Sequence, residues 1–139
     1  FFAYPDGRLA DGPEVRSRLR DALAAFRPEW ILAFDPDFPP RVQHADHVAS
    51  GRIAGAVADG VPSAEWLLRF STRSGNFAVD TSGLWDRKWE ILMLHSSQFA
   101  GKRDRIEGLV KGRDEDAGRR FGVALAEPFR ARRTETGND

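Results

Sequence analysis

The chain has 139 residues, of which 41% are hydrophobic and 30% are charged, which is enough apolar material for the core of one domain. Its 21 basic and 21 acidic side chains are spread evenly along the sequence, so it lacks the basic excess of a nucleic-acid-binding protein. No apolar run approaches the roughly 20 residues of a membrane-spanning helix, and no signal peptide is recognisable. These features disfavour nucleic acid as the main partner and predict a cytoplasmic protein.

Cysteine is absent, which excludes disulfides, thiolate metal ligands and cysteine nucleophiles. Any metal would have to be held by carboxylates and by the three histidines of the sequence. The chain begins inside the apolar segment Phe1-Phe2-Ala3-Tyr4 rather than with Met. We therefore expect it to be part of a longer protein.

The first half of the chain has the helix, strand, loop and helix order that is typical of an α/β protein. A helix with one apolar stripe is expected over 13–27, opened by Gly12-Pro13. The apolar run at 30–34 is interpreted as a buried strand of a parallel sheet. A loop with three prolines over 35–43 leads into a second helix, which begins near 44–46 and runs to about 59.

The second half adds two strands, at 66–70 and 76–79, with Ser74-Gly75 as the turn between them. A third helix is expected from about 84 to 98. The predicted fold class is therefore α/β, with a Rossmann-like parallel sheet flanked by helices, as in the C-terminal part of such a domain.

The C-terminal third is harder to assign. Residues 101–120 are charged and contain four glycines, so a loop with short helical pieces is expected there. The last apolar segment, 121–129, is followed by a polar tail at 130–139. We expect this tail to be loosely ordered.

The segment with the most chemical information lies at the predicted start of the second helix. In open α/β sheets, ligands bind at the carboxyl ends of the strands, where loops meet helix N-termini. His44 and His47 are three residues apart, so both imidazoles can face one pocket, although this spacing also occurs in helix caps and surface pairs. Asp46 can accept a hydrogen bond from an imidazole and fix its tautomer. A catalytic zinc takes about three protein ligands, and the spacing leaves Asp35, Asp37 and Asp46 open as the third.

Eight short motifs follow one another along almost the whole chain. They are Pro5-Asp6-Gly7-Arg8-Leu9, Arg27-Pro28-Glu29-Trp30, Phe34-Asp35-Pro36, His44-Ala45-Asp46-His47, Val79-Asp80-Thr81-Ser82, Lys88, His95-Ser96-Ser97-Gln98 and Ala126-Glu127-Pro128-Phe129. In this order they resemble the PIG-L (LmbE-like) N-acetylglucosaminyl deacetylase family. The resemblance implies a Rossmann-like α/β fold and a zinc-dependent hydrolase that removes acetyl groups from N-acetylglucosamine-type sugars. It assigns 1–129 to a partial deacetylase domain and 130–139 to the tail.

The resemblance also implies roles for four residues. His47 corresponds to a zinc ligand. His44 corresponds to the histidine that supports the tetrahedral intermediate and protonates the leaving amine, and Asp46 to the acid that tunes that histidine. Asp6 corresponds to an aspartate that helps to hold the sugar. The family's other zinc ligands and its general base lie in an N-terminal His-Pro-Asp-Asp-Glu motif, which these 139 residues do not contain, so we expect the chain to be inactive by itself.

Other functions are compatible with the same sequence. The chief alternative is a non-catalytic α/β module that binds a carbohydrate or a partner. A nucleotide-binding Rossmann domain is disfavoured because no G-x-G-x-x-G motif follows a strand. The expected partner is a small amino-sugar substrate, and the sequence predicts neither which sugar conjugate it is nor the oligomeric state.

Overall fold

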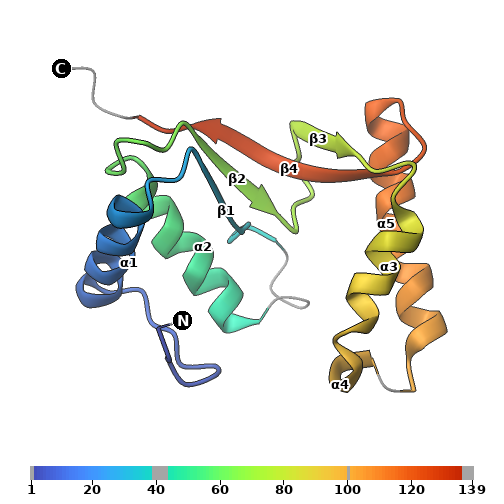
Figure 1. The fold of residues 1–139 in the computed structure, drawn as a ribbon, viewed down its shortest axis with the longest axis horizontal. Helices are drawn as coiled ribbons and strands as arrows, with labels where there is room; N and C mark the ends of the chain where they lie inside the picture. The colour runs from blue at the N-terminus through green and yellow to red at the C-terminus, as the bar shows by residue number, and fades with distance from the viewer. Residues whose placement is uncertain (1, 39–43, 100, 136–139) are drawn as a thin grey trace. The chain divides into compact units, whose positions relative to one another are not determined.

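The computed structural model describes residues 2–38, 44–99 and 101–135 (Figure 1). Its helices and strands are, in chain order, α1 (Pro13–Phe26), β1 (Trp30–Phe34), α2 (Ala45–Ala58), β2 (Trp66–Phe70), β3 (Phe77–Asp80), α3 (Trp85–Met93), α4 (Ser96–Phe99), α5 (Arg103–Phe121) and β4 (Ala126–Arg133). The chain divides into two compact units. The first comprises Phe1–Phe77 with Phe129–Asp139, and the second comprises Ala78–Pro128.

Within the described residues, four strands form one sheet in the order β1-β2-β4-β3. β1 and β2 run parallel, with Trp30 opposite Trp66 and Phe34 opposite Phe70. β4 runs antiparallel to β2. The α/β prediction is therefore confirmed, but the sheet is mixed rather than wholly parallel. The turn predicted at Ser74-Gly75 does not join neighbouring strands, because β4 lies between β2 and β3.

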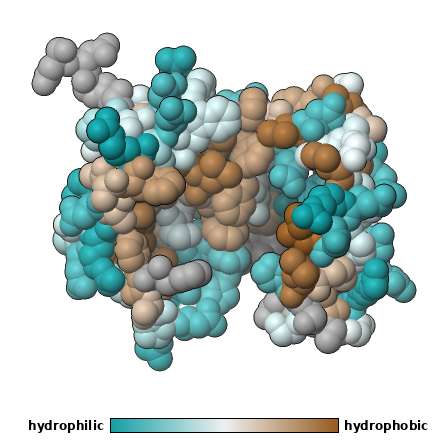
Figure 2. Space-filling model, in the orientation of Figure 1, coloured by the Kyte–Doolittle hydropathy of each residue, from teal (hydrophilic) through white to brown (hydrophobic). Residues whose placement is uncertain are grey.

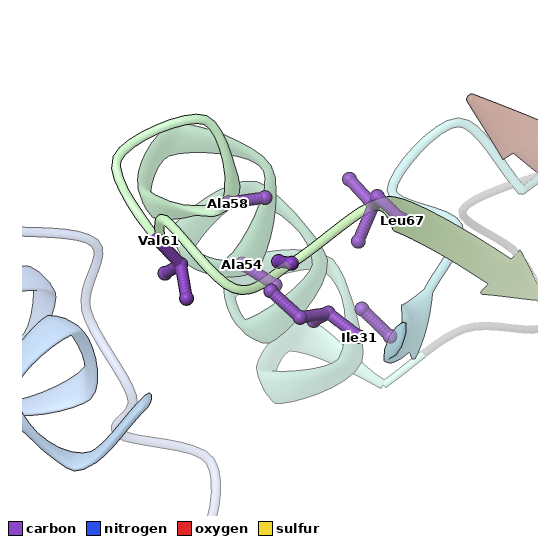
Figure 3. Close-up of a cluster of buried hydrophobic side chains, with 7 residues drawn as sticks. Ile31, Ala54, Ala58, Val61 and Leu67 are labelled. Atoms are coloured by element: carbon purple, nitrogen blue, oxygen red, sulfur yellow. The ribbon is translucent and has the colours of Figure 1, made fainter. Parts of the chain in front are cut away.

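The core of the first unit lies between the β1–β2 pair and α2. Ile31 and Leu67 from the strands meet Ala54 and Ala58 of α2, and Val61 closes the cluster (Figure 3). Alanine has no side chain beyond Cβ, so its place on the inner face of α2 lets the helix lie close to the sheet. The second helix thus matches its prediction in both extent and packing.

The opposite face of β1 is exposed, although the apolar run had predicted a strand that is buried throughout. Trp30 and Leu32 alternate with the buried residues, and they are 53% and 57% exposed. A short apolar run cannot by itself show whether one face of a strand or both are covered. Exposed apolar side chains are visible as brown areas among hydrophilic ones in Figure 2. None of the described helices combines the length and the apolar character needed to cross a bilayer.

The largest error of the sequence prediction concerns the segment that follows α4. In place of a loop with short helical pieces, one 19-residue helix, α5, extends from Arg103 to Phe121. Gly108 and Gly112 stand in open positions, where glycine costs a helix only about 1 kcal/mol relative to alanine. Gly122 ends the helix in the left-handed conformation. The segment is therefore helical despite the weak helix propensity of its glycines.

Ion pairs connect α3 to α5 and to β4 in the second unit. Lys88 of α3 pairs with Asp114 of α5 at 2.6 Å and also with Glu127 of β4. Asp114 is only 6% exposed, so its charge requires a cationic partner. The predicted third helix is divided into α3 and α4, which are separate elements.

The expectation of a loosely ordered tail is wrong for residues 130–133, which belong to β4. Their backbone pairs with β2. In addition, the Asn76 side chain accepts from the Ala131 N–H at 2.7 Å and donates to the Ala131 carbonyl at 3.0 Å. Polar side chains do not oppose strand formation when the backbone is paired and the side chains find partners. The loop positions 39–43 and the tail positions 136–139 lie outside the described residues.

An ion pair joins β4 to the end of α2, and it makes the free energy of unfolding depend on pH. Arg132 binds both carboxylate oxygens of Asp59, at 2.6 and 3.0 Å. This hydrogen bonding, with help from the Glu135 N–H, lowers the pKa of Asp59 below its ordinary value of 3.8. The stabilisation is therefore present above the ordinary pKa and is lost as the pH falls through the lowered one.

We expect Asp59→Asn to lower the free energy of unfolding at pH 7 and to make it fall less steeply between about pH 5 and pH 2. Urea unfolding of the native chain and the variant across this range is the measurement. Two parallel pH profiles would contradict the assignment.

Candidate active site

The candidate site is built on the first turn of α2. His44 is the N-cap residue, with extended backbone (φ −67°, ψ 144°), and its carbonyl accepts from the His47 N–H at 3.0 Å. Its ring Nδ1 accepts from the Asp46 N–H at 3.3 Å. A side-chain acceptor at this position satisfies an N–H that the helix itself leaves unpaired. This arrangement places the proton of a neutral His44 on Nε2.

The carboxylate of Asp46 holds a second segment against this turn. One oxygen accepts from the Gly7 N–H at 2.7 Å and the other from the Leu9 N–H at 3.1 Å. Gly7 has a φ of +72°, which glycine adopts without strain, and the Arg8 N–H donates to the Pro5 carbonyl at 3.1 Å. The turn predicted at 5–9 is therefore bound to the Asp46 carboxylate through two of its backbone N–H groups.

Three of the four residues singled out from the sequence come together as a result. Asp6 Oδ1 lies 3.8 Å from His44 Nε2, and Asp46 Oδ2 lies 3.8 Å from His44 Nδ1. Donor atoms of all three residues lie within 4.8 Å of one another. The side chains are graded in exposure, from 97% for Asp6 through 45% for His44 to 22% for Asp46. Both ring nitrogens of His44 thus have a carboxylate at ion-pair distance.

The fourth residue, His47, lies beside this group but is held differently. Its ring stacks on Phe34 at the end of β1, with centroids 3.7 Å apart and planes 7° from parallel. The His44 ring centroid is 5.6 Å away. Burial, followed by the nearby His44, lowers the pKa of His47, and Asp46 opposes this shift. A neutral imidazole with a free nitrogen lone pair is the form that binds metals.

The two other acids considered as ligands have a different role. Asp35 and Asp37 are both bound by Arg130 of β4, and neither belongs to the cluster of donors around His44. Sequence reasoning missed Arg130 because this residue lies in the expected tail. One signal was available: an aspartate directly after a buried strand needs a cation, although the sequence does not say which of the basic residues supplies it.

The donor set fits one side of a zinc site. Imidazole and carboxylate are ligands that zinc accepts, and a catalytic zinc takes about three of them. Both oxygens of Asp46 already accept backbone N–H groups, so Asp46 suits positioning better than ligation. The described residues therefore supply His47, with His44 and Asp6 alongside, and this falls short of a complete metal shell.

This arrangement is typical of a class of α/β proteins in which ligands bind where a strand end meets a helix N-terminus. Residues 1–58, which include the turn at 5–9 and both site histidines, match the family model described as PIG-L: GlcNAc-PI de-N-acetylase. The resemblance to the PIG-L (LmbE-like) family predicted from the motifs is thereby confirmed for this segment, which is less than half of the chain. No match was found among curated proteins.

Solved structures with the same fold agree with this relationship. The N,N'-diacetylchitobiose deacetylase from Pyrococcus horikoshii superposes with a TM-score of 0.84 and 25% identity, over 93% of this chain and 55% of that one. The conserved protein TT1542 from Thermus thermophilus gives 0.72 and 28%, over 91% and 61%. GalB, a 4-carboxy-2-hydroxymuconate hydratase from Pseudomonas putida KT2440, gives 0.61 and 16%, over 94% and 65%, and it supports the fold alone. The chain thus spans between about half and two thirds of the length of these structures.

α2 approaches β1 so closely that Gly51 admits no side chain. A Cβ there would stand 2.3 Å from the Phe34 carbonyl oxygen and 3.1 Å from Pro36 Cδ. We expect Gly51→Ala to push α2 away from the strand and to lower the free energy of unfolding by about 1–3 kcal/mol, as overpacking does. Gly112→Ala, in an open position of α5, is the matched control and should stabilise by up to about 1 kcal/mol. Urea unfolding distinguishes the two, and equal effects would contradict the close approach.

The burial of His47 gives a second prediction. We expect NMR titration to place the pKa of His47 below the ordinary 6.5, and Phe34→Ala to raise this pKa because it opens the ring to water. A lowered histidine pKa means that the unfolded chain binds the proton more readily. The free energy of unfolding should therefore decline as the pH falls below about 6.5. A His47 pKa of 6.5 or above would contradict the packing on Phe34.

Proposed function

We propose that this chain forms part of a zinc-dependent hydrolase that removes an N-acetyl group from an N-acetylglucosamine-type sugar or sugar conjugate. The observation that carries the proposal is the grouping of Asp6, His44 and Asp46 beside His47, within the segment that matches the de-N-acetylase family model. The likeness to the diacetylchitobiose deacetylase over 93% of this chain supports the same substrate class.

Each residue has a chemical part that its surroundings favour. Zinc, when bound, would polarise the amide carbonyl and acidify a water molecule. His47, whose pKa is lowered by burial and by the nearby His44, offers a metal ligand. His44, which is half exposed, can donate its Nε2 proton to a leaving amine when the ring is in the protonated imidazolium form. Asp46, with one carboxylate oxygen 3.8 Å from His44 Nδ1, can stabilise the protonated ring and so tune this acid. The exposed Asp6 can accept a hydrogen bond from a sugar hydroxyl.

The remaining donors are proposed to come from outside these residues. The 139 residues lack the His-Pro-Asp-Asp-Glu motif that the family resemblance associates with the other ligands and the general base. A single histidine ligand with exposed neighbours holds zinc weakly. The isolated chain should therefore bind zinc weakly and release no acetate.

The histidine roles are tested in the natural protein that contains this sequence. We expect His47→Ala to lose both bound zinc and acetate release from N-acetylated amino sugars. His44→Ala should keep its zinc and lower turnover by about 10²–10⁴-fold, the usual contribution of a general acid. His95→Ala, in the α3–α4 connection, is the control and should change neither quantity. Metal analysis and acetate release measured on the same preparations give both readouts.

Two results would count against the proposal in different ways. Full turnover of a zinc-loaded His44→Ala protein would contradict the acid role. A natural protein that holds no zinc and releases no acetate, but still binds an amino sugar, would support the alternative of a non-catalytic carbohydrate-binding module.

A further inference from the structure

We propose that Arg130 is a positioning residue for the candidate site, because it fixes the turn between β1 and α2 by binding two aspartates at once. Asp35 follows the last residue of β1 and is 1% exposed. One of its oxygens accepts from Arg130 Nη2 at 2.5 Å and from the Asp37 N–H at 3.1 Å. Arg130 Nη1 pairs with the Asp37 carboxylate at 2.7 Å.

The geometry of the guanidinium makes this contact specific. Its two terminal nitrogens lie in one rigid plane, so a single side chain can bind two carboxylates in a fixed relation. A lysine ammonium supplies the same charge as a point on a flexible stem. The Asp35 N–H also donates to the Phe70 carbonyl at 2.9 Å. The start of the turn is therefore fixed through both its backbone and its side chain.

Contacts on either side of this turn connect it to the candidate site. Phe34, which precedes Asp35, carries the stacked ring of His47. The Phe34 carbonyl and the Pro36 ring are the atoms that exclude a side chain at Gly51 of α2. The first turns of α2 therefore pack against the segment that Arg130 binds. A change in its position would move His47.

The charges that face Arg130 come from two other segments of the first unit. Asp35 and Asp37 belong to the turn, and Arg69 of β2 stands opposite Arg130 in the strand register. Burial, followed by Arg130 and Arg132, lowers the pKa of Arg69, while both aspartates oppose this shift. The two aspartates therefore pair with Arg130 and also stabilise the charge of Arg69.

Two substitutions test this role without leaving a buried charge unpaired. Arg130→Lys keeps a cation beside Asp35 but cannot span both carboxylates, and Asp37→Asn removes one of the two contacts at a side chain that is 71% exposed. Arg132→Lys, on the same strand but paired with Asp59, is the matched control. Circular dichroism and urea unfolding verify that each protein is folded.

The decisive readout is the proton NMR shift of the His47 ring, which the stacked Phe34 ring moves upfield. We expect this upfield shift to diminish in Arg130→Lys and Asp37→Asn and to stay unchanged in Arg132→Lys. Retention of the full shift in both folded test variants, or an equal loss in the control, would overturn the proposal.

The consequence for metal rests on the proposed function. In the natural protein that contains this sequence, zinc affinity should fall by about 10–100-fold in Arg130→Lys, the usual effect of disturbing a residue that supports a ligand. Unchanged zinc affinity together with a lost His47 shift would show that the positioning does not reach the metal. A natural protein that binds no zinc would refute the proposed function, and the His47 shift would still decide the role of Arg130.

Discussion

The carboxylate of Asp46 is the contact on which the candidate site depends. It accepts two N–H groups from a turn almost 40 positions earlier in the chain, and it does so from the first turn of a helix, where negative charge is favoured by the helix dipole. Through these bonds Asp6 is brought to His44. These bonds fix the 5–9 turn to the first turn of α2 and so help to assemble the cluster of donors.

The second constraint is the close packing of α2 on the sheet. The small residues of its inner face allow contact with β1, and at Gly51 the contact is between backbone and backbone. Because α2 packs so close to β1, the His47 ring stacks on the ring of Phe34. The same packing lowers the pKa of this imidazole, which favours the neutral form that binds metals. The close packing of α2 on β1 thus contributes both to the core and to the surroundings of His47.

The arrangement divides the four site residues into two pairs. Asp46 and His47 are oriented by contacts within the fold, with a turn and with a strand end. His44 and Asp6 are more exposed and have room to contact a substrate. This division suits the proposed hydrolase, since a metal ligand such as His47 and the residue that positions its neighbours must be rigid, while groups that contact a substrate must be accessible. It is also the reason why the family relationship and the geometry support the same proposal.

The sequence by itself determined the elements that have strong local signals. The helix opened by Pro13, the apolar strand at 30–34, the second helix and the grouping of His44, Asp46 and Asp6 all follow from turn chemistry, periodicity or motif resemblance, and α5 was missed because its glycines weaken the local signal. Tertiary structure alone decided which strands are neighbours, that one face of β1 stays exposed, and that Arg130 is a partner of Asp35. These outcomes depend on contacts between residues as many as 95 positions apart. No local pattern records such pairings, because the free energy of a buried charge depends on which partner the fold brings to it.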